Sequence, residues 1–210
     1  VMRLILASTS PRRKDLLALL QIPFEVVAPP FQEQVSQESS AAEQAQRFAL
    51  GKAWSCAQQY PDSLVLGSDT LISVGTYVLG KPADLDEARA ILRSLRGREH
   101  VIHTAVAICR KRDDLQDLAA EKVRVWMNNL SDAEVEAYLQ TEEWIGKAGA
   151  YSIQDSGSRL ITRIEGEYTA AVGLPLRLVA CLLQRHGVDV PDIQKLYQTK
   201  PYLNWSRFAP

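Results

Sequence analysis

The chain has 210 residues, of which 46% are hydrophobic and 23% are charged. At roughly 150 residues per domain, this length allows one large domain or two small lobes and excludes a multidomain assembly. The 24 Lys and Arg residues nearly balance the 25 Asp and Glu residues, so the formal net charge is −1. Such a chain is not expected to bind a nucleic-acid polymer or an anionic membrane, and any anionic ligand must meet a local cluster of cations.

The first elements alternate between strand and helix. Pro11 preceded by Ser10 is a helix start signal, and Ser40 with Glu43 has the spacing of a capping box. The predicted elements of this part are a strand over 4–7, a helix over 11–21, a strand over 24–28, a polar loop over 29–40 and a helix over 41–60.

The alternation continues through the middle of the chain. Ser131 and Glu134 repeat the capping-box spacing, Gly97 is placed to end a helix, and Gly75 with Thr76 indicates a hairpin turn. The predicted elements are strands over 64–66, 71–74 and 77–79, a helix over 84–97, strands over 100–109 and 118–127, and a helix from 131. No linker divides the chain, so we expect one α/β domain with two lobes around a cleft.

The three cysteines, Cys56, Cys109 and Cys181, lie far apart and form no CxxC pair. This pattern predicts neither a disulfide framework nor a zinc site, and we expect three small buried side chains in a reducing compartment. The N-terminus lacks the pattern of a signal peptide, and the longest apolar tract, residues 170–183, is shorter than the roughly 18 residues that span a bilayer. We therefore expect a cytoplasmic protein.

A phosphate-binding loop of the Walker type is a weak interpretation of residues 75–81. The segment matches GxxxxGK, but Pro82 stands where a hydroxyl would bind magnesium, and no helix follows directly. Lys81 is kept as a candidate phosphate ligand.

The stronger candidate anion site is residues 8–14, Ser-Thr-Ser-Pro-Arg-Arg-Lys. A strand that feeds a hydroxyl-rich turn into a helix start aims free backbone amides at a ligand, and the forked guanidinium groups of Arg12 and Arg13 match phosphate oxygens. A solvated first helical turn is the alternative interpretation. Cations near a helix N-terminus oppose the helix dipole, however, which favours a bound anion.

Two carboxylates are candidates for the chemistry. Asp69 follows a buried apolar run, and we expect it at the rim of a cleft, where it is able to hold a metal or deprotonate water; a capping or turn aspartate is the alternative. Glu33 in the polar loop is a second carboxylate able to share a divalent cation, or simply an exposed loop charge. His100 and His103 are expected on opposite faces of a strand, which predicts structural roles.

Five blocks of residues, in this order, resemble the motifs of the Maf family over about residues 4–187. They are Ala7-Ser8-Thr9-Ser10-Pro11-Arg12-Arg13, Gly67-Ser68-Asp69-Thr70, Gly80-Lys81-Pro82, Lys147-Ala148-Gly149-Ala150-Tyr151-Ser152-Ile153-Gln154 and Val172-Gly173-Leu174-Pro175-Leu176. We assign residues 1–195 to the Maf-like domain and 196–210 to a C-terminal tail, which either packs on a partner or is loose.

The resemblance implies a nucleoside triphosphate pyrophosphatase, in which water attacks the α-phosphorus with Mg²⁺ or Mn²⁺ present. It also implies a cytoplasmic homodimer whose mixed twisted sheet is flanked by helices, with the nucleotide in a central cleft. Two alternatives stay open. One is a pyrophosphatase for modified nucleotides, and the other is a nucleotide-sensing regulator of septum formation without turnover.

The resemblance further assigns roles to single residues. Asp69 matches the acid usually assigned as the general base. Metal binding by Asp69 together with Glu33 is a further hypothesis, and whether Asp69 takes the proton, holds the metal or does both stays open. The positions linked to substrate choice are Arg12, Thr70 and Gln154, and those expected to bind phosphate are Ser8, Ser10, Arg13, Lys52 and Lys81. The subgroup similar to a 7-methyl-GTP pyrophosphatase carries Trp and Gln at the positions of Arg12 and Thr70 and lacks the Ile153-Gln154 pair, so the resemblance is to the dTTP/UTP type. An amide at Gln154 is physically consistent with this, because it matches the polar edge of thymine or uracil. Asp155 stands where the family usually has Gly, which predicts an altered local turn.

Overall fold

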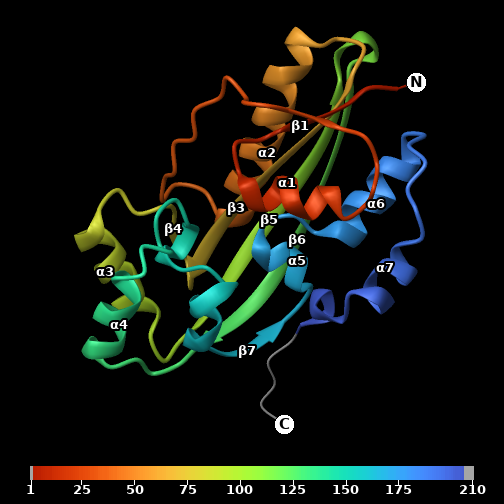
Figure 1. The fold of residues 1–210 in the computed structure, drawn as a ribbon. Helices are drawn as coiled ribbons and strands as arrows, with labels where there is room; N and C mark the ends of the chain where they lie inside the picture. The colour runs from red at the N-terminus through yellow and green to blue at the C-terminus, as the bar shows by residue number, and fades with distance from the viewer. Residues whose placement is uncertain (1, 206–210) are drawn as a thin grey trace.

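The computed structural model describes residues 2–205, and within them a seven-stranded mixed sheet runs the length of the molecule (Figure 1). The strand order is β2-β1-β3-β5-β6-β7, and β4 pairs with part of β3. β1 pairs in parallel with β2 and β3, whereas the other pairs are antiparallel. The strands are β1 (Leu4–Ala7), β2 (Glu25–Val27), β3 (Leu64–Val74), β4 (Tyr77–Leu79), β5 (Glu99–Arg110), β6 (Leu115–Met127) and β7 (Ile161–Glu165).

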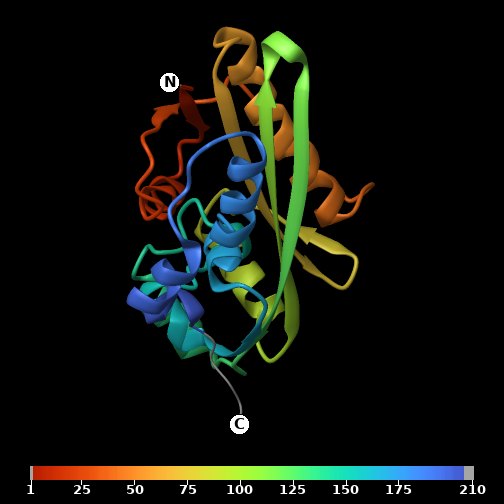
Figure 2. The same ribbon diagram turned by 90° about the vertical axis from the view of Figure 1, so that its right-hand side faces the viewer.

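Helices cover both faces of this sheet, which confirms the predicted α/β class. In Figure 2, α2 lies on one side of the long strands, and α1 and α6 lie on the other. The pair α3 and α4 packs at the end of the sheet that carries β4 (Figure 1). The helices are α1 (Pro11–Ala18), α2 (Ala41–Gln59), α3 (Leu85–Leu95), α4 (Asp132–Leu139), α5 (Tyr168–Val172), α6 (Leu176–Arg185) and α7 (Ile193–Thr199).

The sheet face under α2 is built from small residues. Ala49 and Ala53 of α2 pack with Ala105 and Ala107 of β5 in one fully buried cluster. At Gly67 of β3 the backbones approach so closely that an added Cβ would lie 2.4 Å from the carbonyl oxygen of Ala49. Larger side chains from the opposite face, with α1, α3, α5 and α6, form the main core.

Local start and turn signals in the sequence are confirmed. Ser40 and Ser131 each accept a hydrogen bond from the backbone amide three residues on, and each forms a complete capping box. Gly75 has a φ of 56° in the hairpin turn between β3 and β4. Gly97 has a φ of 68° just after α3.

One strand differs from the prediction. Residues 64–66 and 71–74 are not separate strands, because β3 continues through Gly67-Ser68-Asp69-Thr70. β5 pairs with β3 without interruption from Val65 to Ser73, and this pairing holds the polar stretch extended. Asp69 therefore lies inside a strand with 2% of its surface exposed, and its expected position at a rim after a strand end is wrong.

One cysteine and the C-terminal segment also differ from the prediction. Cys56 and Cys109 are buried, but Cys181 is exposed on α6, because its position falls on the outer side of that helix. Residues 196–205 pack on the domain, with Tyr197 and Leu203 buried, so the boundary placed at 195/196 falls inside α7. Residues 206–210 of the expected tail lie outside the described residues.

Among residues 2–205, no helix has the length and apolar character needed to cross a membrane.

Candidate active site

A cavity of about 500 Å³ collects nearly all the residues that the sequence singles out. Its walls come from the turn after β1, the loop after β2, α2, β3, the segment after β4 and residues 145–153. Of the ten predicted site residues, every one except Gln154 lines it: Ser8, Ser10, Arg12, Arg13, Glu33, Lys52, Asp69, Thr70 and Lys81.

The sheet explains why the cavity forms at this place. The parallel pairing of β1 with β3 ends where Ala7 faces Gly67, and the pairing of β4 with β3 begins only at Ile72. In the interval between them, Asp69 and Thr70 line the cavity. The site thus lies beyond the carboxyl end of a parallel strand, where ligands of α/β proteins commonly bind.

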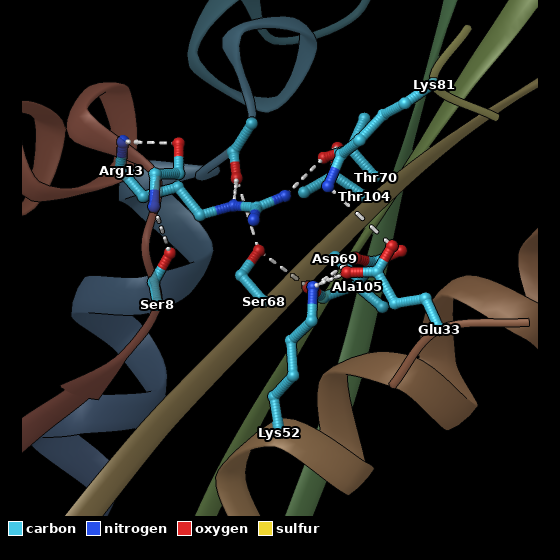
Figure 3. A network of polar contacts seen from close by, with 12 residues as sticks. Ser8, Arg13, Glu33, Lys52, Ser68, Asp69, Thr70, Lys81, Thr104 and Ala105 are labelled. Carbon is cyan, nitrogen blue, oxygen red and sulfur yellow. Dashed lines mark hydrogen bonds and ion pairs between the residues drawn. The ribbon is translucent and has the colours of Figure 1, made fainter. Parts of the chain in front are cut away.

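Lys52 joins two carboxylates across the cavity floor. Its Nζ lies 2.5 Å from Oδ1 of Asp69 and 2.5 Å from Oε1 of Glu33, and Lys81 Nζ lies 3.8 Å from the other oxygen of Glu33 (Figure 3). Lys52 is 6% exposed. Because a buried ammonium group is stable only when it is paired, this cluster fixes the positions of both acids.

The two carboxylates are not equivalent. Burial raises the pKa of Asp69, and the positive charges of Lys52 and Arg13 offset this effect only in part. Burial also acts to raise the pKa of Glu33, but Lys52, Lys81 and Arg13 outweigh it and hold that pKa below its ordinary value. Glu33 therefore stays an anion, whereas Asp69 is the carboxylate better suited to accept a proton.

The loop that carries Glu33 is held by contacts that sequence patterns do not reveal. Gln44 of α2 is fully buried, and its amide group exchanges hydrogen bonds of 2.9 and 2.7 Å with the backbone of Ser36. Phe31 packs over Gly51, where an added Cβ would lie 2.2 Å from the ring. Gly51, next to Lys52, was the sequence signal for this close approach. The sequence did not show that Phe31 is the residue that packs against it.

The turn after β1 has the expected character of an anion site. Ser10 caps α1 by accepting a hydrogen bond from the amide of Arg13, and Ser8 Oγ accepts one from the amide of Ser10. Each hydroxyl acts as an acceptor in these bonds, so its own hydrogen is left to donate to a bound anion. Burial and the neighbouring Arg13 lower the pKa of Arg12 to about 10, and burial lowers the pKa of Arg13. A bound anion would stabilise this pair of cations.

Arg13 is positioned by a directed chain of hydrogen bonds (Figure 3). The hydroxyl of Thr104 donates to the carbonyl oxygen of Ala170 at 2.8 Å, so in its 2.9 Å contact with Thr70 the donor is Thr70. Arg13 donates from Nη2 to Thr70 at 3.1 Å and from Nε to the carbonyl oxygen of Gly173 at 2.8 Å. The hydroxyl hydrogen of Thr70 therefore points toward Thr104 and not into the cavity.

Gln154 does not line the cavity, although its neighbour Ile153 does. Burial raises the pKa of Tyr168, at the start of α5, and a side-chain hydrogen bond from Gln154 acts in the opposite direction. The backbone amide of Gln154 donates a hydrogen bond of 3.3 Å to Oγ of Ser152. Asp155 adopts a left-handed φ of 52°, a conformation that Asp tolerates better than most residues, so the turn forms without glycine.

Two more cavity residues were missed as site candidates. Lys147 adds a cation, and its pKa is lowered by burial and by Arg12. Tyr151 lines the cavity, and its hydroxyl lies 2.7 Å from Nε2 of the buried His100. His103 instead contacts Ser73 at 2.9 Å, which agrees with the structural roles predicted for both histidines.

The carboxylates fit a cation that a ligand helps to hold. Among residues 2–205, no group of three or more His, Cys, Asp and Glu side chains is placed to hold a metal ion. Within the same residues, however, Oδ2 of Asp69 is buried without a hydrogen-bond partner, and Glu33 lies across Lys52 from it. Mg²⁺ in proteins is often held by one or two carboxylates together with phosphate oxygens and water, and this donor set fits that pattern.

Fold and site together define an α/β protein whose cleft suits a polyphosphate. Five cationic side chains line the cavity against two carboxylates, which leaves three formal positive charges uncompensated. The cations are Arg12, Arg13, Lys52, Lys81 and Lys147, and the acids are Glu33 and Asp69.

Comparison with known proteins assigns the family. The model of the Maf-like protein family matches residues 3–186. Proteins named dTTP/UTP pyrophosphatase are similar to this chain over most of their length: one from Bacillus cereus is 38% identical over 90% of this chain and 97% of its own, and one from Pelotomaculum thermopropionicum is 39% identical over 89% and 98%. A solved HAM1 protein from Coxiella burnetii is similar with a TM-score of 0.49 and 13% identity, covering 88% of this chain and 100% of that chain. The chain belongs to the Maf family.

Proposed function

We propose that this protein hydrolyses dTTP and UTP to the nucleoside monophosphate and pyrophosphate. The observation that carries the proposal is the buried carboxylate of Asp69, one oxygen of which has no hydrogen-bond partner among the described residues, inside a cavity with an excess of positive charge. The names of the relatives supply the substrate, since proteins 38% and 39% identical to this chain are called dTTP/UTP pyrophosphatase.

In this proposal the phosphates lie against the start of α1. Backbone amides of the first helical turn and the hydroxyl groups of Ser8 and Ser10 donate to phosphate oxygens, and Arg12 and Arg13 offset the negative charge. Lys81 extends the cationic wall from the other side of the cleft. These groups are fixed before the ligand binds, so they stabilise charge in the transition state without reorganising.

The reaction itself is a hydrolysis at the α-phosphorus. Water forms the new P–O bond, Asp69 accepts its proton, and the bond between the α-phosphorus and the bridging oxygen breaks, so that pyrophosphate leaves with the electron pair. Lys52 holds Asp69 through Oδ1 and leaves Oδ2 to take the proton. A divalent cation held by Glu33 and the triphosphate beside Asp69 would add positive charge against the phosphates and make the water more acidic.

Recognition of the base is assigned to Gln154. A primary amide donates one hydrogen bond and accepts another, which matches a carbonyl and the ring N–H of thymine or uracil. A base that leaves these groups unpaired is rejected. We further propose that the enzyme is a cytoplasmic homodimer and takes no nucleic-acid polymer; its net charge of −1 supports the last point.

The test is release of pyrophosphate from dTTP, UTP, CTP, 7-methyl-GTP and ITP with Mg²⁺ or Mn²⁺. We expect dTTP and UTP to be the preferred substrates. Preference for ITP or 7-methyl-GTP would instead support a pyrophosphatase for modified nucleotides, and binding without any release would support a sensor.

Asp69→Asn removes the proton acceptor with little change in shape. General-base catalysis contributes about 100-fold or more, so we expect the rate of pyrophosphate release to fall by at least that factor. A variant that keeps more than about a tenth of the wild-type rate would rule out Asp69 as the base.

A further inference from the structure

We propose that Gln37 is a positioning residue for Lys81, the cation that reaches the phosphates from the far side of the cleft. Gln37 lies in the polar loop that also carries Glu33, and it does not line the cavity itself. The inference deepens the proposed function and rests on it, because it takes the cleft to bind the phosphates of a nucleotide.

The loop that carries Gln37 is held on α2 at two places. Phe31 packs over Gly51, and the side-chain amide of Gln44 bonds to both backbone groups of Ser36, at 2.9 and 2.7 Å. The same amide also donates to the carbonyl oxygen of Ser39 at 2.8 Å. Because Gln44 is fully buried in a helix of 19 residues, these bonds give the loop a fixed position on the helix that carries Lys52.

Gln37 joins this fixed loop to β4. Its Nε2 donates to the carbonyl oxygen of Val78 and its Oε1 accepts from the backbone amide of Val78, each at 2.9 Å. Val78 stands opposite Ser73 in the pairing of β4 with β3, so the bonds to Gln37 give it a second partner. The side chain of Gln37 thus takes the place of a neighbouring strand at Val78.

The contacts continue from Gln37 toward the cavity at every second loop position. Val35 lies against Gly80, where an added Cβ would be 3.3 Å from Cγ2 of Val35. Glu33 lies 3.8 Å from Nζ of Lys81 (Figure 3). Loop positions 33, 35 and 37 therefore meet positions 81, 80 and 78 in the opposite chain direction, with the two-residue period of an extended segment. Gln37 closes this series at the end away from the cavity.

Lys81 needs this support because its own contacts are weak. Lys52 is buried between Asp69 and Glu33, with both carboxylate oxygens at 2.5 Å, so its ammonium group is already paired. The side chain of Lys81 is 53% exposed, and 3.8 Å from Glu33 is too long for a hydrogen bond. Its ammonium hydrogens are thus available to phosphate oxygens. Where they lie depends on where the backbone of residues 78–81 is fixed.

The experiment is a double-mutant cycle of Gln37→Met and Lys81→Met. Pyrophosphate is titrated calorimetrically in EDTA, so that no divalent cation contributes. We expect Lys81→Met to weaken binding by about tenfold or more, as for a lost hydrogen bond between charged groups. Gln37→Met should weaken it by about three- to fivefold, because the 3.2 Å bond from the amide of Gly149 to the carbonyl oxygen of Gly80 still supports the segment. The double variant should bind pyrophosphate as Lys81→Met does, since Gln37 acts through Lys81.

Gln184→Met is the matched control. It removes another exposed glutamine whose amide donates to a backbone carbonyl oxygen, that of Val190, and neither residue lines the cavity. The control should keep the wild-type affinity for pyrophosphate. Because Gln37 is exposed, we expect its variants to fold, and Gln37→Ala repeats the cycle with a second side chain.

Four results would overturn the inference. They are wild-type affinity in Gln37→Met, losses that multiply in the double variant, an equal loss in Gln184→Met, and no binding of pyrophosphate by the wild type. Losses that multiply would show that Gln37 acts on the fold independently of Lys81. If the wild type binds pyrophosphate but does not hydrolyse dTTP, the proposed function fails, and the cycle still decides the role of Gln37.

Discussion

Two effects act in opposite directions on the pKa of Asp69. Burial favours its neutral acid, and Lys52, 2.5 Å away, favours the carboxylate. Lys52→Met removes the cation and leaves the burial, so the pKa of Asp69 should rise further. A general base is active only when it is deprotonated, and activity is lost as the pH falls through its pKa. We therefore expect the acid limb of the kcat/KM profile to move to higher pH in Lys52→Met.

The pH profile of Lys52→Met is measured beside that of Lys111→Met, which removes a lysine from the distant turn between β5 and β6. The control should keep the wild-type acid limb. An unchanged or lower apparent pKa in Lys52→Met would show that the limb does not report Asp69.

Thr70 has two possible roles, direct recognition of the base and positioning of Arg13. The resemblance assigns it to substrate choice, whereas its hydroxyl accepts from Arg13 and donates to Thr104. Thr70→Val breaks both bonds and releases a guanidinium that we assign to phosphate binding. We expect kcat/KM to fall by about tenfold or more for every triphosphate alike, as for loss of a hydrogen bond to a charged group.

Rates for dTTP, UTP and CTP are compared in Thr70→Val and in Thr162→Val, a control on β7 whose hydroxyl bonds to Asn128. A loss confined to one base would instead support direct base recognition by Thr70.

Single residues of the site were predictable where the neighbouring residues in the sequence already indicate a binding role. Arg12 and Arg13 at a helix start stand out because cations there oppose the dipole. Phe31 and Tyr168 do not stand out, because an aromatic residue in a loop or helix is usually part of the core. Their contacts with Gly51 and Trp205 join segments that are distant in the chain.

At the scale of elements, the distance between α2 and β3 sets the geometry of the Lys52–Asp69 pair. Gly67 allows this approach, since an added Cβ would meet the backbone of Ala49 at 2.4 Å and of Ala53 at 2.8 Å. Gly67→Ala should push α2 away and lower the free energy of unfolding by about 1–3 kcal/mol, the usual cost of overpacking. Lys52 lies between these two alanines on α2, so activity should fall as well.

Urea unfolding and pyrophosphate release are measured on the same samples. Gly75→Ala is the control. Gly75 has a φ of 56°, and no atom of residues 2–205 lies within 4 Å of an added Cβ, so the variant should lose about 1 kcal/mol through backbone strain and keep its activity. Full activity in Gly67→Ala would contradict the coupling between helix position and the ion pair.

Elements were predicted well where their signals are local. The capping boxes at Ser40 and Ser131 and the turn at Gly75 follow from neighbouring residues alone. The continuity of β3 through Gly67-Ser68-Asp69-Thr70 was missed, because small and polar residues in one run are typical of a turn. Pairing with β5, about 35 residues further along, overrides that preference.

Over the whole molecule, a chain with a net charge of −1 has one cleft in which cationic side chains outnumber carboxylates by five to two. The segments that supply these cations are far apart in the sequence. The resemblance to the family motifs predicted that they share one cleft, whereas the charge balance alone did not predict this. The C-terminal segment contains no family motif, so the sequence predicted only a tail for residues 196–210. In the structure, residues 196–205 pack against α5.

The most direct test of the proposed chemistry is hydrolysis of dTTP in water enriched in oxygen-18, with the products analysed by mass spectrometry. Attack at the α-phosphorus predicts dTMP that carries one heavy oxygen, together with unlabelled pyrophosphate, and almost no product from Asp69→Asn. Labelled pyrophosphate with unlabelled dTMP, or release of orthophosphate and dTDP, would contradict the account, because water would then have attacked a different phosphorus.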